Sequence, residues 1–159
     1  MTDHVLLAQY QSPIGVITLV SDGSSLTEVR LIQPPTPYLS NSHNLQVFAD
    51  TFRWLDLYFS GRKPDFTPSL NPKGSSFQQK VWCELLAIPY GHTTSYGAIA
   101  KRLNCRSAQA VGQAVHRNPI AIIIPCHRVI GSDGSLTGYA AGLEIKQQLL
   151  TLERSEKGK

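Results

Sequence analysis

The sequence predicts an α+β fold, in which a small antiparallel sheet with one helix precedes a mostly helical lobe. Two observations predict it: short β-rich runs fill the first third of the chain, and apolar residues at helical spacing fill the second half. A third observation is a Pro/Asn/Gly-rich stretch at 63–74, which separates the two patterns. We therefore expect an N-terminal lobe at residues 1–71 and a C-terminal lobe at 72–159.

Three strands are expected in the N-terminal lobe, at 4–10, 14–20 and 26–32. Ser12-Pro13 separates the first pair, and Ser-Asp-Gly-Ser at 21–24 separates the second pair. A proline-rich loop follows, and then apolar residues recur at helical spacing until Gly61: Val47, Phe48, Phe52, Leu55 and Phe59. This helix is expected to cover one face of the sheet.

The C-terminal lobe begins with a capping box, in which Ser75 precedes Gln78 by three residues. The helix that follows should end near Pro89. Two short helices are expected from about residues 95 and 107, joined by a turn at 104–106. They form a helix-turn-helix candidate, although any helical hairpin gives the same pattern. A last helix at 143–153 should turn three side chains inward, those of Ile145, Leu149 and Leu152.

Composition excludes several classes of protein. The first ten residues lack the basic-then-apolar pattern of a secretion signal, and the three cysteines are odd in number without Cys-x-x-Cys spacing. A reducing, cytoplasmic location is the simplest expectation. Because no apolar run approaches the roughly 18 residues that span a bilayer, no membrane role is expected. A net charge of +4 permits nucleic-acid binding without requiring it.

The most informative segment is Ile-Ile-Ile-Pro-Cys-His-Arg-Val-Ile at 122–130. An aliphatic run that stops at Pro125 indicates a buried segment that ends abruptly, with Cys126 at the edge of the core. A cysteine in such a place is often an inert, buried apolar residue. Two potential cations follow it, His127 and Arg128, and nearby cations favour the reactive thiolate. Both interpretations remain open at this point.

A nucleophilic role for Cys126 requires a base, since a free thiol is only a few per cent ionised at neutral pH. His127 is the candidate base, although neighbouring side chains in an extended segment point apart, so it would act through a turn or a water. Glu153 could orient the imidazole. The alternatives are a histidine bonded within the core and a glutamate at a solvated helix end.

The expected helix at 107–117 is thin, because small side chains recur along it: Ser107, Ala108, Ala110, Gly112 and Ala114. Arg106 and Arg117 flank it. Small residues allow tight packing of one helix on another, and with flanking arginines they also suit insertion into a DNA groove. Composition does not decide between the two.

Together these motifs resemble the methylated-DNA--protein-cysteine methyltransferases. The resemblance is carried by Pro-Cys-His-Arg-Val at 125–129, Asn118-Pro119, Gly138-Tyr139 and Gly142-Leu143, and it extends through Phe-Gln-Gln-Lys-Val-Trp at 77–82, Ile-Pro-Tyr-Gly at 88–91, Thr-Ser-Tyr-Gly at 94–97 and Ala-Val-Gly at 110–112. It covers most of residues 75–153. Ser-Pro-Ile-Gly at 12–15 is a weaker match.

The resemblance implies direct repair of O6-alkylguanine, and less efficiently of O4-alkylthymine, in double-stranded DNA. The alkyl group would move to Cys126 in a single irreversible turnover, without cofactor or metal. It also implies a ribonuclease H-like N-terminal lobe, a monomer, and a thin helix that enters the minor groove while the damaged nucleotide is flipped out.

The resemblance assigns roles to individual residues. The catalytic group is Cys126, with His127 as base through water, Glu153 as its partner, Asn118 as holder of the turn and Tyr96 as a helper of extrusion and leaving-group protonation. DNA contacts are expected from Gln78, Tyr96, Arg106, Gln109, Ala110, Gly112 and Ser132. The base would be bound at Val129, Tyr139 and Ala140.

One position departs from the family pattern. Gln109 stands where the family usually has an arginine that fills the space left by the flipped base, and the turn before it is one residue shorter. Glutamine lacks the charge and stacking plane of guanidinium. Gln109 is expected to keep this role with weakened extrusion, with Arg106 able to supply part of it.

Three other functions fit some of these sequence features. A DNA-lesion binder without catalysis is disfavoured by the presence of Cys126. A zinc site lacks any recognised ligand spacing among Cys83, Cys105 and Cys126. A cysteine hydrolase would differ from the main hypothesis by turning over repeatedly.

Overall fold

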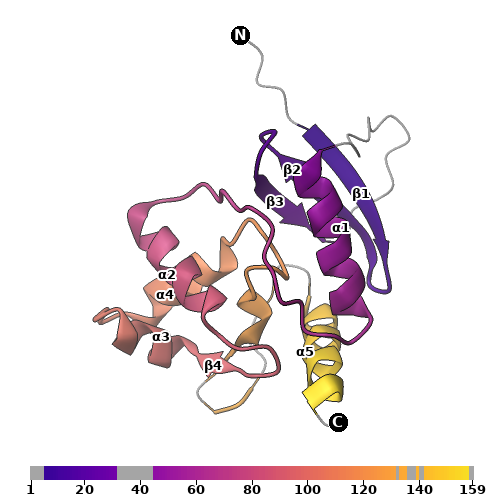
Figure 1. Ribbon diagram of the computed structural model, residues 1–159. Coiled ribbons are helices and arrows are strands. Elements are labelled where there is room, and N and C mark those ends of the chain that lie inside the picture. Colours follow the sequence, from indigo (N-terminus) through magenta and orange to yellow (C-terminus); the bar gives the residue numbers. More distant parts are fainter. Residues whose placement is uncertain (1–5, 32–44, 132, 136–138, 140–141, 158–159) are drawn as a thin grey trace. The chain divides into compact units, whose positions relative to one another are not determined.

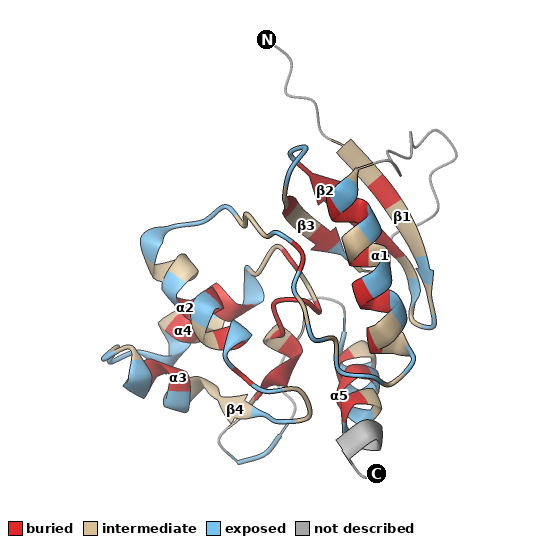
Figure 2. Cartoon of the chain, viewed as in Figure 1, coloured by how far each residue is buried: buried red, intermediate tan, exposed pale blue. Residues whose placement is uncertain are grey.

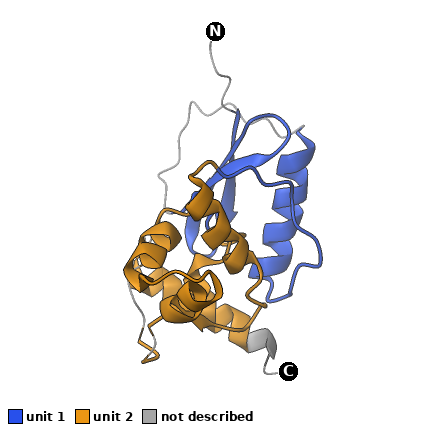
Figure 3. Cartoon of the chain, turned by 90° about the vertical axis from the view of Figure 1, so that its left-hand side faces the viewer, with its two compact units in different colours: residues 1–72, 119–121 blue, residues 73–118, 122–159 orange. Residues whose placement is uncertain are grey.

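The computed structural model describes residues 6–31, 45–131, 133–135, 139 and 142–157. It divides into two compact units (Figure 3). Unit 1 holds residues up to 72 together with 119–121, and unit 2 holds 73–118 and 122–159. The predicted α+β class is confirmed: one unit contains the small sheet with a helix, and the other is mostly helical (Figure 1).

Unit 1 is built on a three-stranded antiparallel sheet of order β1-β2-β3. Its strands are β1 (Leu6–Ser12), β2 (Gly15–Ser21) and β3 (Leu26–Arg30), within one or two residues of the prediction where the chain is described. The β1–β2 hairpin closes where Ser12 pairs with Gly15, whose φ of 114° suits glycine. The Ser12 hydroxyl donates to the Gly15 carbonyl at 2.6 Å and closes the turn.

Helix α1 (Gln46–Phe59) packs on this sheet through aromatic contacts. The ring of Tyr10 on β1 lies 5.7 Å from that of Phe52 and 6.3 Å from that of Phe59, centroid to centroid. Fully buried residues from the sheet and the helix form the core of the unit: Ile17, Leu19, Leu26, Phe48, Leu55 and Tyr58 (Figure 2). The predicted cover of one sheet face is therefore correct.

The edge strand β3 gains two further partners from distant parts of the chain. Leu26 forms a parallel bridge with Leu70, and Val29 forms another with Ile120. The Val29 N–H donates to the Pro119 carbonyl at 2.9 Å. Residues 119–121 therefore belong to this sheet, although the chain on either side of them belongs to unit 2.

Unit 2 starts with α2 (Ser76–Leu86), and the predicted capping box is present. Ser75 accepts from the Gln78 N–H at 3.1 Å, and the Gln78 side chain accepts from the Ser75 N–H at 2.9 Å. Val81, Trp82 and Leu85 are buried. The Trp82 indole N–H donates to the Ala114 carbonyl at 2.9 Å, so that α2 is bound to the helix at 108–116.

A helix-turn-helix follows, formed by α3 (Tyr96–Arg102) and α4 (Ala108–His116). Serine caps start both helices: Ser95 accepts from the Ala98 N–H and Ser107 from the Ala110 N–H. The predicted turn contains Asn104 at φ 54°, a conformation that asparagine tolerates. Val111, Ala114 and Val115 bury one face of α4.

Two short strands, which the sequence did not reveal, join the helix-turn-helix to the cysteine motif. β4 (Thr94–Ser95) pairs in parallel with β5 (Val129–Ile130). The ladder has two rungs, Thr94 with Val129 and Ser95 with Ile130. It binds the start of α3 directly to the residues that follow the cysteine motif.

The aliphatic run before Cys126 is buried, as predicted, but it forms turns rather than an extended segment. Ile122 has φ 69°, a strained conformation for a β-branched residue, and its fully buried side chain holds it there. The chain then enters a 3-10 turn, η1 (Cys126–Arg128). The expectation of an extended segment at Cys126 is therefore wrong.

The last helix, α5 (Leu143–Lys157), is four residues longer than predicted, and its buried face also differs. Lys146, Leu149, Leu150 and Glu153 are buried, whereas Ile145 and Leu152 are only partly buried. The buried stripe therefore begins at a lysine and ends at a glutamate. Among the described residues, no helix is both long and apolar enough to cross a membrane.

Candidate active site

Cys126 is the first residue of the 3-10 turn and is partly exposed, while the residues on both sides of it are buried. Its N–H donates to the Ile124 carbonyl at 2.8 Å. The Asn118 side-chain amide donates to the same carbonyl at 2.7 Å. Both hydrogen bonds therefore end on one carbonyl oxygen, two residues before the sulfur.

Burial raises the pKa of the Cys126 thiol above its ordinary value. Three side chains and one backbone group act in the opposite direction: the polar groups of Asn118 and Tyr139, the positive charge of Lys146 and the backbone N–H of Cys126 itself. Neither His127 nor Arg128 is among the groups that lower the pKa of this thiol. Ionisation of this thiol needs a proton acceptor close by.

His127 and Glu153 form a buried pair, with Nε2 and Oε2 2.5 Å apart. The histidine is fully buried and the glutamate is 1% exposed. The alternative of a solvated helix end for Glu153 is thus excluded. Burial lowers the pKa of His127, and Arg128 and Lys146 lower it further, although Glu153 acts in the opposite direction. His127 is accordingly a neutral imidazole that donates to Glu153 through Nε2.

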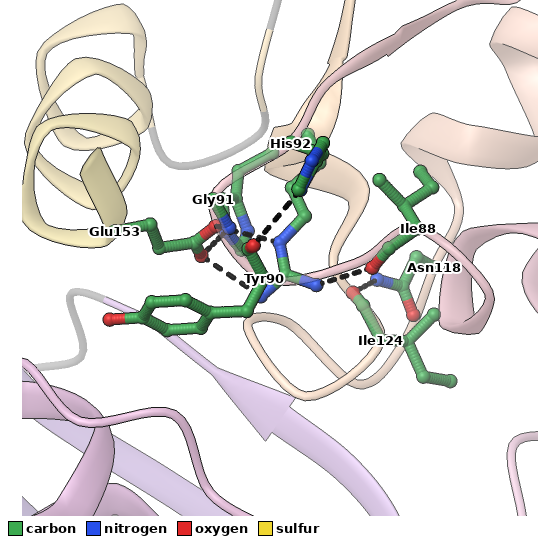
Figure 4. A network of polar contacts seen from close by, with 9 residues as sticks. Ile88, Tyr90, Gly91, His92, Asn118, Ile124 and Glu153 are labelled. Atoms are coloured by element: carbon green, nitrogen blue, oxygen red, sulfur yellow. Dashed lines mark hydrogen bonds and ion pairs between the residues drawn. The ribbon is translucent and has the colours of Figure 1, made fainter. Parts of the chain in front are cut away.

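Arg128 completes this network and does not face the sulfur. Its Nε and Nη2 donate to the two carboxylate oxygens of Glu153 at 2.8 and 3.1 Å, and Nη1 donates to the Ile88 carbonyl at 2.8 Å. The Gly91 N–H donates to Oε1 of Glu153 at 3.2 Å (Figure 4). The guanidinium also lies 5.6 Å from the centre of the Tyr90 ring.

The carboxylate of Glu153 is therefore held by three partners on two segments, Gly91 and the turn residues His127 and Arg128. Burial alone would raise its pKa, but the hydrogen bonds from His127 and Arg128 and the charge of Arg128 outweigh burial and lower the pKa to about 2. Glu153 stays ionised at neutral pH and fixes both the orientation and the tautomer of the imidazole. The Nδ1 atom of His127 is then the ring nitrogen that can accept a proton.

Lys146 is a site residue that sequence reasoning missed. Its side chain is fully buried on α5, and its charge acts on Cys126, His127 and His116. Burial lowers its pKa, and Cys126 acts in the opposite direction. Its spacing from Leu149, Leu150 and Glu153 on one helix face was the available signal, but the sequence analysis considered only the aliphatic residues of this helix and Glu153.

Tyr139 also belongs to the site. Its hydroxyl is enclosed, and its pKa is raised well above the usual value by burial and by the negative charge that Cys126 carries when ionised. The hydroxyl does not reach full hydrogen-bond geometry with any described residue, yet it lies close enough for its O–H dipole to act on the sulfur. Tyr139 therefore stays protonated and can stabilise a thiolate.

The residues that the resemblance assigns to DNA contact and to base binding differ in how far they are exposed. Arg106 and Gln109 are exposed, and Ala110, Gly112 and Tyr96 are partly buried on the helix-turn-helix. Gln78 uses its side chain in the capping box of α2. Ser132 and Ala140 lie outside the described residues, and Val129 is fully buried beside Cys126 in the β4–β5 ladder.

In the described part of the chain, no group of three or more His, Cys, Asp or Glu side chains could hold a metal ion. The three cysteines at 83, 105 and 126 are free thiols.

Two family models match the chain and together span most of it. The ribonuclease-like domain of 6-O-methylguanine DNA methyltransferase matches residues 5–72, and the DNA binding domain of the same enzyme matches residues 76–155. The chain belongs to the 6-O-methylguanine DNA methyltransferase family. It is a DNA-binding methyltransferase of DNA repair, as its resemblance to this family implied.

Individual members of the 6-O-methylguanine DNA methyltransferase family align over almost the whole chain. The methylated-DNA--protein-cysteine methyltransferase of Methanosarcina acetivorans is 46% identical over 155 residues, which cover 93% of this chain and 97% of the relative. The enzyme of the same name from Mycobacterium tuberculosis is 47% identical over 148 residues, or 91% and 89% of the two chains.

Solved structures of the family show the same fold. The crystal structure of Mycobacterium tuberculosis OGT in complex with DNA superposes with a TM-score of 0.86 at 44% identity, covering 96% of this chain and 94% of that one. A methyltransferase from Methanococcus jannaschii gives a TM-score of 0.70 at 30% identity, covering 92% of each chain.

Proposed function

We propose that this protein repairs O6-alkylguanine in DNA, and less efficiently O4-alkylthymine, by transferring the alkyl group to Cys126 once per molecule. The observation that carries the proposal is a free cysteine at the start of a turn whose next two residues bind one buried carboxylate. Residues 72–159 would form the DNA-binding and alkyl-acceptor domain, and residues 1–71 a supporting α/β lobe. The protein would act as a monomer.

The transfer is a displacement at carbon. The sulfur of Cys126 forms a bond to the alkyl carbon while the bond from that carbon to O6 breaks, and the electron pair leaves with the guanine oxygen. In the net reaction, the thiol loses one proton and the nucleobase gains one, so that ordinary guanine is left in the DNA. A thioether is left on the protein, and since water does not hydrolyse a thioether as it does a thioester, no second turnover follows.

The proton path follows from the His127–Glu153 pair. With Nε2 bound to Glu153, Nδ1 accepts the thiol proton through a water molecule. The thiolate that forms is stabilised by Asn118, Tyr139 and the charge of Lys146, the three side chains that oppose the effect of burial. Because burial disfavours the thiolate before the substrate arrives, the resting thiol is protected from other electrophiles.

DNA would be engaged by the helix-turn-helix. The small and polar residues of α4 suit the minor groove, and the target nucleotide must leave the stack to reach Cys126, at a cost of a few kcal/mol. Tyr96 would assist extrusion and protonate the leaving group, and Gln109 would fill the gap, with Arg106 beside it. Gln78, Ala110, Gly112 and Ser132 would contact the DNA backbone, while Val129, Tyr139 and Ala140 would bind the base.

A reducing compartment suits this chemistry. The acceptor and the two other cysteines are free, and a disulfide at Cys126 would block the transfer. We therefore place the protein in the cytoplasm. The proposed reaction uses no cofactor, since the sulfur, the base and the leaving group supply every bond that forms or breaks.

The test is stoichiometry. The protein is incubated with duplex DNA that carries O6-methylguanine, and the peptide containing Cys126 is then weighed. It should gain the mass of one methyl group less one hydrogen, at most once per chain. Repeated turnover without an adduct would contradict the proposal and favour a hydrolase.

A matched variant separates catalysis from binding. Cys126→Ala should abolish transfer while DNA binding persists, because the side chain is partly exposed and small. If the adduct forms on Cys83 or Cys105 instead, the assignment of the acceptor is wrong. Binding with no adduct in the wild-type protein would support the non-catalytic lesion binder.

A further inference from the structure

The ring of Tyr96 lies against one face of α4, on two residues a single helical turn apart. The ring of His116 is stacked on it at 6.2 Å between centroids, with 29° between the planes. At Gly112, an added Cβ would lie 3.6 Å from Cδ1 and 3.7 Å from Cε1 of the tyrosine. Residues four apart share a helix face, so Gly112 and His116 form one seat for the ring.

This seat couples two elements that the proposed function treats separately. Tyr96 is the first residue of α3, and Ser95 before it pairs with Ile130 in the β4–β5 ladder. The backbone of Tyr96 is thus fixed next to the cysteine motif. The side chain is oriented by α4, the helix proposed to enter the groove.

We infer that His116 is a positioning residue, which holds the Tyr96 ring in the orientation that extrudes the damaged nucleotide. The inference rests on the proposed function, in which Tyr96 assists extrusion. It assigns to His116 a role that depends on its aromatic ring rather than on a charge. Stacked aromatic rings favour one relative orientation, and that preference is lost with an aliphatic side chain.

The electrostatic surroundings agree with a neutral ring. Burial lowers the pKa of His116, and the charge of Lys146 on α5 lowers it further. At neutral pH the imidazole is therefore uncharged. An ion pair with a phosphate would require the protonated form, which these surroundings disfavour.

The experiment compares His116→Ala and His116→Phe in single-turnover transfer with saturating protein. Each variant is assayed on duplex DNA and on a single strand of the same sequence, both carrying O6-methylguanine. A single strand presents a base that needs no extrusion from a paired stack. His116→Ala should slow transfer on the duplex about fivefold and leave the single-strand rate unchanged, and His116→Phe should restore the duplex rate.

The inference is overturned if His116→Ala slows both substrates equally, or if phenylalanine fails to rescue the duplex rate. A double-mutant cycle adds a second measurement: in a Tyr96→Ala background, the further change His116→Ala should have no effect on the duplex rate. Full additivity would show that His116 acts elsewhere.

The wild-type reaction distinguishes a failure of the proposed function from a failure of the role of His116. If no methyl group reaches Cys126, the proposed function fails. If transfer occurs and the ratio of duplex to single-strand rates is the same in His116→Ala as in wild type, only the role of His116 fails. Thermal unfolding of His116→Ala should match wild type, because the residue is exposed.

Discussion

The cysteine turn and helix α4 are neighbours in sequence but differ in where their ionisable and polar side chains lie. Behind Cys126, four ionisable side chains are at most 7% exposed: His127, Arg128, Lys146 and Glu153. On α4, the polar residues Gln109 and Gln113 are exposed, and only aliphatic residues are buried. Ionisable side chains are buried behind Cys126, whereas the polar side chains of α4 lie at the surface.

This difference predicts different kinds of mutational effect. A buried ion pair that loses one partner leaves an uncompensated charge, so changes to the Arg128–Glu153 pair behind Cys126 should reduce both stability and transfer. Exposed positions on α4 bear little of the folding free energy, and changes there should alter only the step that involves DNA. The five predictions below run from the largest expected effect to the smallest.

Glu153→Gln should have the largest effect. It leaves the buried Arg128 without its charge partner and removes the group that orients His127, so we expect a loss of about 3–5 kcal/mol in the free energy of unfolding and no measurable transfer. Chemical denaturation measures the first and adduct formation the second. The control is Glu144→Gln, an exposed glutamate at the start of the same helix, which should change stability by less than about 0.5 kcal/mol.

The same residue predicts a pH dependence. The pKa of Glu153 is about 2 in the folded protein against an ordinary value of 4.5, so its contribution is present above pH 4.5 and is lost as the pH falls toward 2. Wild type should lose stability across this window, and Glu153→Gln should lose less. Equal slopes in both proteins would show that the carboxylate is not held as described.

Lys146→Met should reduce transfer without reducing stability. The substitution removes a cation that favours the Cys126 thiolate, so the pH profile of single-turnover transfer should move to higher pH and the rate at neutral pH should fall about tenfold. Stability should be equal or higher, because burial already disfavours the ammonium ion. Lys146→Arg retains a cation and serves as the comparison. An unchanged pH profile in Lys146→Met would exclude an electrostatic role.

Gln109→Ala should affect only duplex DNA. If Gln109 fills the space left by the flipped base, its removal should slow transfer on duplex DNA about fivefold, from the loss of about 1 kcal/mol of contact with the neighbouring bases. Gln109→Arg should raise the same rate, and unfolding should be unaffected, since the side chain is exposed. If Gln109→Ala repairs duplex DNA at the wild-type rate, another residue fills the gap, and Arg106→Ala becomes the next test.

Gly112→Ala should have the smallest effect, a gain of about 0.5–1 kcal/mol in stability, since alanine is the better helix former. The new methyl group would make ordinary van der Waals contact with the Tyr96 ring at 3.6 Å. Gly74→Ala is the contrasting case, because its Cβ would overlap the Trp82 ring and must displace it. The midpoint temperature of thermal unfolding should therefore rise for Gly112→Ala and fall for Gly74→Ala.

Most of the fold could be predicted because its signals are local. Turn residues bound the strands, Ser75 and Gln78 mark the start of α2, and Ser95 and Ser107 cap the next two helices. The β4–β5 ladder escaped prediction, because two-residue strands carry no periodic pattern and their pairing joins positions far apart in the chain. The attachment of 119–121 to β3 escaped for the same reason.

The sequence predicted which residues lie at the site, except Lys146, but not how their charges act on one another. The order Pro-Cys-His-Arg indicated an acceptor with a base beside it, and the structure brings His127 and Glu153 together. Adjacency suggested that Arg128 acts on the sulfur, whereas the 3-10 turn directs it to Glu153. Lys146 takes the place expected of an arginine or histidine near the thiol, because α5 turns a different face inward than its aliphatic pattern suggested.

The parallel pairing of Thr94–Ser95 with Val129–Ile130 has a consequence for how such a sequence can diverge. Only two residues, His127 and Arg128, separate Cys126 from the first rung, and none separates the second rung from Tyr96. One residue inserted at either place would shift the pairing by one position and turn the side chains to the opposite face. The spacing of these two segments is therefore constrained more tightly than their composition: substitutions can be absorbed there, but insertions and deletions cannot.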